Sequence, residues 1–277
     1  MSDRLRLTKP LPSLEAWVQA FARAEIPVLA DTAEALELMR ATEDDVDAHG
    51  LGEMIATDPL MSLKVMAHAS ELRRGRLTAA PETVTAALVL MGITPFFRTF
   101  GPQPTLDAVL AGHDEALMGL SRVMQRAERA SRYALGFAAH RADPDAAVIH
   151  SAALLHDFAE MLLWVHAPTL ALQIAALQDA DRHLRSAAAQ RQVLGIVLAD
   201  LEQALMKHWH LPELLTRITG DKHEHDPQVR CVQLAVRVAR HTARGWDDAG
   251  VPDDLHDIAV LLNLSEAHTL KLLHEFD

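Results

Sequence analysis

The chain has 277 residues, and 49% of them are hydrophobic, which is enough for one large domain or two smaller ones with buried cores. Its 38 acidic and 26 basic residues give a formal net charge of −12, which argues against nucleic acid as a partner, because phosphate binding needs clustered Lys and Arg. The one cysteine, Cys231, excludes an intrachain disulfide and a cysteine-rich zinc site.

Helix-start signals recur along the whole chain. An acidic or hydroxyl residue followed by proline is typical of an N-cap and the first helical position, and this pair occurs four times. The four pairs are Asp58-Pro59, Thr94-Pro95, Asp143-Pro144 and Asp226-Pro227. The sequence shows no alternating strand pattern and no Asn-Gly or Asp-Gly hairpin signal, so we expect an all-α fold.

Further signals place other helix ends. Asp31 with Glu34 predicts a capping box, and Ser265 is expected to cap the last helix. Pro81 is expected to begin a helix that ends at Gly92. The apolar spacing of the N-terminal half predicts a core that contains Val28, Leu36, Leu38, Ile55, Leu63, Val65 and Leu88.

The segment 100–115 carries two prolines and two glycines and separates two helical halves. We therefore predict two packed helical lobes, residues 1–108 and 109–277. The N-terminus lacks the apolar core of a secretory signal, and the most apolar stretch, 146–165, is interrupted by four histidine or acidic residues. Such residues are costly in lipid, so a cytoplasmic protein without a membrane partner is expected.

The most unusual feature is the adjacent pair His156-Asp157 inside the apolar run "AALLHDFAEMLLW". Buried charge is costly unless it is paired or bound to metal. The pair is therefore a metal site, the remnant of one, or an ordinary hydrogen-bonded pair in a helical core. Glu160, one turn after His156, could hydrogen-bond it, and His150 lies on the same helix.

Other histidines offer weaker signals. In "DKHEHD", His223 and His225 flank a glutamate, but the segment lies between Gly220 and a proline, which favours an exposed polar turn. His208 and His210 flank a tryptophan that is expected to pack inward. Cys231 stands at an apolar helix position, where an inert buried thiol is expected.

Several segments together resemble the HDOD domain, an all-α bacterial signalling module related to the HD metal-dependent phosphohydrolases. The resemblance covers roughly residues 26–240. Its N-terminal matches are "IPVLADTAEALELM", "MIATDPLMSLKVMAHAS" and "ETVTAALVLMGITPFFR". Its C-terminal matches are "AALLHDFAEMLLW", "VLGIVLADLEQALMKHWHLPELL" and "QLAVRVAR". The resemblance implies a multi-helical HDOD/HD-like fold.

The departures from the family pattern concern the metal site. Active HD phosphohydrolases gather several His and Asp residues around metal, whereas Leu120, Leu198 and Val236 stand where three of these ligands are expected. Ala159-Glu160 replaces the Gly-Lys that often follows His-Asp. An apolar side chain cannot bind a divalent cation, and a catalytic zinc normally needs three protein ligands. On this resemblance His156-Asp157 is a relic, kept as a buried hydrogen-bonded pair.

The resulting hypothesis is a non-catalytic module of bacterial signal transduction, without a cofactor, that binds other signalling proteins. The rival is an HD-type phosphohydrolase acting on a nucleotide or cyclic dinucleotide. Its Fe, Mn or Zn would need a site rebuilt from the pair and other histidines, among them His150, His183, His208 and His223. A third alternative is a small-ligand sensor that uses the degenerate pocket, for which His150, His223 and Glu160 are the candidate residues. The oligomeric state stays open, with a homodimer as one alternative.

Overall fold

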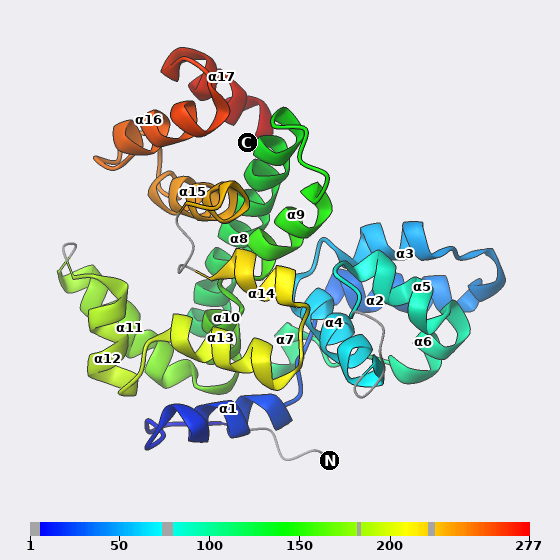
Figure 1. The fold of residues 1–277 in the computed structure, drawn as a ribbon. Coiled ribbons are helices and arrows are strands. Elements are labelled where there is room, and N and C mark those ends of the chain that lie inside the picture. The colour runs from blue at the N-terminus through cyan, green and yellow to red at the C-terminus, as the bar shows by residue number, and fades with distance from the viewer. Residues whose placement is uncertain (1–5, 74–79, 182–183, 221–224) are drawn as a thin grey trace. The chain divides into compact units, whose positions relative to one another are not determined.

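A computed structural model describes residues 6–73, 80–181, 184–220 and 225–277 (Figure 1). These residues form helices joined by short connections, and no β-strand occurs among them beyond two isolated bridges, Val28–Thr105 and Ala243–Gly245. The predicted all-α fold is thereby confirmed. The segment "DKHE" and His183, to which some sequence predictions refer, lie outside the described residues.

The chain forms two compact units, and each combines two separate stretches of sequence. Unit 1 comprises the residues up to Val123 together with Asp157–Leu211, and unit 2 comprises Met124–His156 with Pro212–Asp277. The sequence-based division into lobes 1–108 and 109–277 stays a prediction. The two units are a different kind of division, because they are defined by the contacts within each of them.

Unit 1 contains the following helices: α1 (Leu14–Arg23), α2 (Ala30–Ala41), the 3₁₀ turn η1 (Glu43–Asp45), α3 (Ala48–Ile55), α4 (Pro59–Arg73), α5 (Val84–Met91), α6 (Ile93–Thr99), α7 (Leu106–Val109), α10 (Phe158–His166), α11 (Pro168–Ala180), α12 (Ser186–Leu194) and α13 (Leu198–His208). Unit 2 contains α9 (Ala146–Leu155), α14 (Glu213–Thr219), α15 (Pro227–His241), α16 (Val251–Leu262) and α17 (Glu266–Phe276). The long helix α8 (Asp114–His140) contributes to both units.

Unit 1 packs sequence-distant helices together. The N-terminal helix α1 lies against α13, and α10 contacts α4, α11 and α13. Trp17 and Phe21 of α1 are fully buried. Their rings pack edge to face, with 5.4 Å between the ring centroids. The same unit holds α5 against α3 and α4. Unit 1 is therefore complete only when the N-terminal stretch and Asp157–Leu211 come together.

The predicted N-terminal core is correct except at one position. Val28, Leu36, Ile55, Leu63, Val65 and Leu88 are all buried. Leu38 is wrong, because 66% of its surface is exposed. Residues i and i+2 of an α-helix point in directions about 200° apart around the helix axis. Leu36 and Leu38 of α2 therefore cannot both face the same core.

Asp58 links α4 to the segment before α2. It is fully buried, and its carboxylate accepts hydrogen bonds from the backbone N–H groups of Leu60 at 2.9 Å and Met61 at 3.0 Å, as the predicted N-cap requires. Its other oxygen accepts from the N–H of Leu29 at 2.8 Å. Burial raises the pKa of Asp58, and these hydrogen bonds oppose that rise. One carboxylate thus fixes two segments of unit 1.

Unit 2 is built around α15. This helix packs on α9, α14 and α16, and α17 packs on α16. The predicted N-cap Asp226 accepts from the N–H of Gln228 at 2.9 Å. The side-chain amide of Gln228 donates to Asp143 at 3.1 Å and to Asp145 at 2.8 Å, which ties α15 to the connection before α9.

Two of the remaining predicted helix ends hold. The hydroxyl of Ser265 caps α17 by accepting from the N–H of His268 at 3.3 Å. Gly92 ends α5 with a positive φ of 79°, which glycine adopts without strain. Both confirm their sequence signals.

Four predicted helix starts are displaced. Asp31 lies in the first turn of α2 and is not its N-cap, because the helix begins at Ala30. Thr94 lies inside α6, which begins directly after Gly92. Asp143 caps a turn, and α9 starts three residues later with Asp145 as its N-cap. After Pro81 the helix starts at Val84, where Thr83 supplies the capping hydroxyl.

Candidate functional site

His156 and Asp157 lie at a helix junction and not inside one continuous helix. His156 is the C-cap of α9 and Asp157 the N-cap of α10. The backbone carbonyl of Asp157 accepts from the N–H groups of Glu160 at 3.0 Å and Met161 at 3.1 Å, which starts the new helix. Both side chains are half-buried, so the expectation of a buried pair is wrong. The two residues are thus more exposed than their buried neighbours Leu155 and Phe158.

The pair also falls on the division between the units, because His156 belongs to unit 2 and Asp157 to unit 1. Each of His156, Asp157 and the half-buried Glu160 takes part in a polar, ring or electrostatic interaction. Asp157 therefore has the partner that a partly buried carboxylate needs.

The apolar run around the pair has the composition of a core segment. The stretch Ala146–His166 is long and apolar enough to span a membrane, but 61% of its most apolar 18-residue window is buried inside the protein. The junction at His156-Asp157 also divides it into helices of 10 and 9 residues, each too short to cross a bilayer. These features are typical of helices that pack in a protein core.

The three positions where the resemblance predicts missing ligands are apolar core positions. Leu120 is fully buried, and Leu198 and Val236 are 6% and 4% exposed. The backbone N–H of Leu198 donates to the side chain of Gln190 at 3.0 Å, so this position also begins α13 with a satisfied donor. None of the three side chains offers a donor atom to a cation. The residues present do not fit the HD metal at these positions.

The histidines of the rival hypothesis are dispersed. His150 is half-buried in α9, and burial lowers its pKa, which favours the neutral imidazole near pH 7. His208 is exposed at the end of α13, whereas His183 and His223 lie outside the described residues. Across the described ranges, no three His, Cys, Asp or Glu side chains lie close enough to hold a metal ion.

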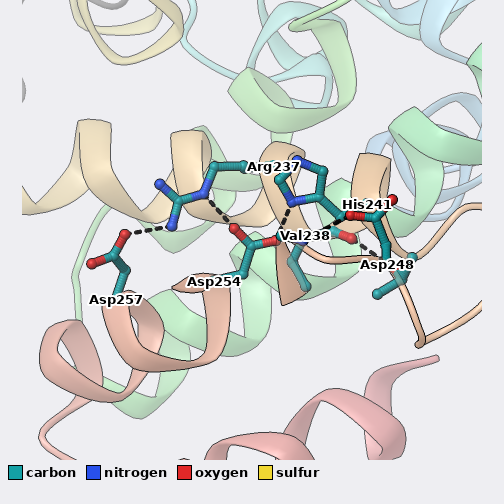
Figure 2. Close-up of polar contacts among 8 residues, drawn as sticks. Arg237, Val238, His241, Asp248, Asp254 and Asp257 are labelled. Carbon is teal, nitrogen blue, oxygen red and sulfur yellow. Dashed lines mark hydrogen bonds and ion pairs between the residues drawn. The ribbon is translucent and has the colours of Figure 1, made fainter. Parts of the chain in front are cut away.

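A cluster that the sequence analysis missed joins α15 to α16 in unit 2 (Figure 2). Its centre is Asp254, whose carboxylate is 1% exposed. One oxygen accepts from Nε of Arg237 at 2.5 Å, and the other accepts from Nδ1 of His241 at 2.6 Å. Arg237 also donates through Nη2 to Asp257 at 2.5 Å. We call Arg237, His241, Asp254 and Asp257 the α15–α16 cluster.

The backbone at the start of α16 is shaped around the imidazole of this cluster. A Cβ atom at Gly250 would lie 2.6 Å from both Cε1 and Nδ1 of His241, so a side chain there has no room. The N–H of Gly250 donates to Asp248 at 2.9 Å, which holds this turn in place. Glycine at 250 therefore lets the ring approach the helix start closely.

The chemistry of the α15–α16 cluster is that of a fixed carboxylate–histidine pair. An ionised carboxylate accepts hydrogen bonds only, so Asp254 sets the proton of His241 on Nδ1 and orients the ring. Both oxygens are satisfied by charged or polar partners, as burial demands. The arrangement links the two helices.

A sequence signal for the α15–α16 cluster exists in outline. Arg237 and His241 are four residues apart on one helix, and Asp254 and Asp257 are three apart on the next, so each pair shares a helix face. Such pairs are common on helix surfaces. The sequence alone does not show that these two faces meet.

Comparison with known proteins identifies the fold. The chain is similar to the MmoQ response regulator of Methylococcus capsulatus str. Bath, with 20% identity and a TM-score of 0.63 over 90% of this chain and 98% of that one. It is also similar to a virulence factor (cj0248) of Campylobacter jejuni subsp. jejuni, with 16% identity and a TM-score of 0.64 over 94% and 90% of the two chains. At these identities the likeness shows a common fold.

A search of curated proteins found no match to the chain. Residues 26–225, which include most of unit 1 and the His156-Asp157 junction, match the family model described as the HDOD domain. The structural likeness extends beyond residue 225, because 90% of 277 residues is more than the 225 residues that end where the family match ends. The chain belongs to the HDOD domain family.

Proposed function

We propose that this HDOD protein is a signalling module that acts by binding other proteins and not by metal-dependent hydrolysis. The observation that carries the proposal is the apolar character of three buried positions, Leu120, Leu198 and Val236, where the HD relatives are expected to hold metal ligands. Metal-ion catalysis of phosphoryl transfer needs an ion held with an open position for water. Burying a divalent ion beside such side chains would cost much free energy.

The His156-Asp157 junction supports the same proposal. Two adjacent residues provide at most two ligands, and both already have interaction partners. Their place at the end of α9 and the start of α10 gives them a structural role at the junction of the two helices. We propose that the pair serves this junction and that the protein works in the bacterial cytoplasm.

The related structures are consistent with a signalling role. MmoQ is named as a response regulator and cj0248 as a virulence factor. Partners of the present chain would be signalling proteins, since its net charge of −12 does not suit nucleic acid. The rival activity, hydrolysis of a nucleotide or cyclic dinucleotide, is the outcome that would replace this proposal.

The experiment uses the purified full-length chain and measures its metal content together with hydrolysis. Cyclic dinucleotides, nucleotides and a chromogenic phosphodiester are incubated with the protein and added Mn²⁺, Mg²⁺ or Fe²⁺. We expect no turnover above that of a His156→Ala, Asp157→Ala double variant and no stoichiometric metal by elemental analysis.

The proposal is wrong if the wild-type protein hydrolyses a substrate and either single variant abolishes that activity while the far-ultraviolet spectrum is unchanged. Stoichiometric metal that disappears in His156→Ala would also refute it. A matched control is His49→Ala, which removes an exposed histidine on α3 that no hypothesis places in the metal site. This control should behave as wild type in every assay.

A further inference from the structure

The side chain of Asp277 lies in a site formed by an arginine and two aromatic rings within unit 2. Arg129, on α8, donates through Nε and Nη2 to the two carboxylate oxygens, with 2.6 Å between Nη2 and Oδ2. Its Nη1 donates to the backbone carbonyl of Thr242 at 3.0 Å. The guanidinium carbon lies 5.6 Å from the ring centre of Tyr133 and 5.8 Å from that of Trp246.

This arrangement is selective for a carboxylate. The planar guanidinium fork matches two carboxylate oxygens, and the aromatic faces stabilise the cation and fix its plane. Burial would raise the pKa of Asp277, but the pKa is lowered because Arg129, with help from Tyr133 and Trp246, stabilises the ionised form. Arg129 is 16% exposed, so solvent screens this pair only in part. The contact is therefore a bidentate ion pair flanked by two aromatic rings.

The residues just before Asp277 also have fitted contacts. The ring of Phe276 fills the space above Gly136 of α8, where a Cβ would lie 2.1 Å from the ring. The ring of His274 lies 4.3 Å, centre to centre, from Trp246. The surface of α8 thus accommodates a helix end that carries an aromatic residue followed by a carboxylate.

Apart from this end, α17 packs on α16 with few buried side chains. All eleven residues of Glu266–Phe276 are described, and among them only Thr269 and Leu273 are buried. The connection from α16 passes through Asn263, which ends that helix in the left-handed region with φ 53° and ψ 46°, a conformation that asparagine adopts more readily than most residues with a side chain. Elements with few buried side chains belong to the part of a protein that opens first.

We propose that α17 is a reversible latch, and that the Arg129 site it occupies is also a recognition site for an acidic segment of a partner protein. The partner segment has an aromatic residue followed by Asp or Glu, the chemistry that Phe276 and Asp277 present in the closed form. When α17 detaches, the guanidinium, the ring of Trp246 and the space above Gly136 become available to that segment. The latch does not depend on whether the domain is catalytic.

The first test is hydrogen exchange of the full-length chain by mass spectrometry. Asp277→Asn keeps the shape of the side chain and removes the charge that Arg129 binds. We expect the exchange rate of the α17 amides to rise about tenfold, with little change in α9 and α15. The matched control is Asp253→Asn, which neutralises an exposed carboxylate on α16 and should leave α17 unchanged. Equal α17 exchange in Asp277→Asn and wild type would overturn the latch.

The second test measures binding of a labelled peptide by fluorescence anisotropy. The peptide LSEAHTLKLLHEFD, residues 264–277 with an amidated end, is added to full-length Asp277→Asn protein. We expect binding that is at least about tenfold weaker when the last peptide residue is Asn, because the fork then loses its charged acceptor. Wild-type protein should bind the acidic peptide more weakly than the variant, since its own Asp277 competes.

Arg129→Lys in the Asp277→Asn background keeps the positive charge but loses the fork, and it should remove the preference for the acidic peptide. Equal affinity of the two peptides for the Asp277→Asn protein would refute the recognition site. That comparison uses one protein and so does not depend on how well the Arg129→Lys variant folds.

Discussion

Removal of the Asp254 carboxylate should destabilise unit 2 strongly. In Asp254→Ala, His241 loses its Nδ1 acceptor, and Arg237 keeps only Asp257 as a carboxylate partner. Breaking a buried ion pair costs about 3–5 kcal/mol. Arg237 and His241 are 39% and 32% exposed, so water can replace part of the lost contact. We therefore expect a loss of about 2–3 kcal/mol.

The assay is thermal and urea unfolding of the full-length protein, with hydrogen exchange to localise the effect. A loss of this size lowers the melting temperature by about 8–24 °C for a unit of 60–100 residues, the size class of unit 2. Exchange should increase first in α15 and α16. Asp253→Ala, an exposed change in the same turn of α16, should remain within about 0.5 kcal/mol of wild type.

The structural reasoning would be refuted if Asp254→Ala and Asp253→Ala unfolded alike. A double-mutant cycle sharpens the test, because His241→Ala and Asp254→Ala share one interaction. Their combined effect should be smaller than the sum of the separate effects. Strict additivity would mean that the 2.6 Å contact contributes nothing to stability.

Three further predictions follow from burial. Leu63→Ala should lower the free energy of unfolding by about 2–5 kcal/mol, whereas Leu38→Ala, the same change at an exposed position, should lower it by less than about 0.5 kcal/mol. Equal melting temperatures of the two variants would contradict this prediction. Burial lowers the pKa of His150 below its unfolded value near 6.5, so the unfolded chain binds more protons than the folded chain below that pH. The free energy of unfolding should therefore fall as the pH drops below about 6.5. In urea titrations, His150→Gln should reduce this fall between about pH 7 and 5.5. Burial raises the pKa of Cys231 to about 11, so the folded protein should not react with iodoacetamide at neutral pH, and rapid alkylation without unfolding would show the thiol to be accessible.

The helical class could be predicted because its signals are local. Asp58, Asp226, Gly92 and Ser265 act within one turn of themselves, and each has the predicted role in the structure. The displaced starts have local causes as well. The hydroxyl of Thr83 caps α5, so the helix begins at Val84 and Pro81 lies before it.

The candidate site was harder to predict because its features depend on contacts between helices. The run "AALLHDFAEM" contains no Gly or Pro, and its one helix-start signal is the capping-box spacing of Asp157 and Glu160. That spacing was not interpreted as the junction at which His156 and Asp157 are half-buried. Asp254 is 13 residues from His241 and 17 from Arg237, and only the packing of α16 on α15 brings them together. The absence of donors at Leu120 and Leu198, in contrast, can be read from the sequence once the resemblance is known.

The composition of unit 1 from two separated stretches has a consequence for biosynthesis. Trp17 and Phe21 on α1 belong to a helix whose packing partner, α13, is synthesised about 180 residues later. A ribosome adds about 5–20 residues per second, so the interval between the synthesis of α1 and that of α13 is on the order of ten seconds or more. During this interval the apolar side chains of Trp17 and Phe21 lack the helix that covers them in the folded unit. Completion of α13, and not of the first 123 residues, marks the point at which this HDOD protein can close unit 1.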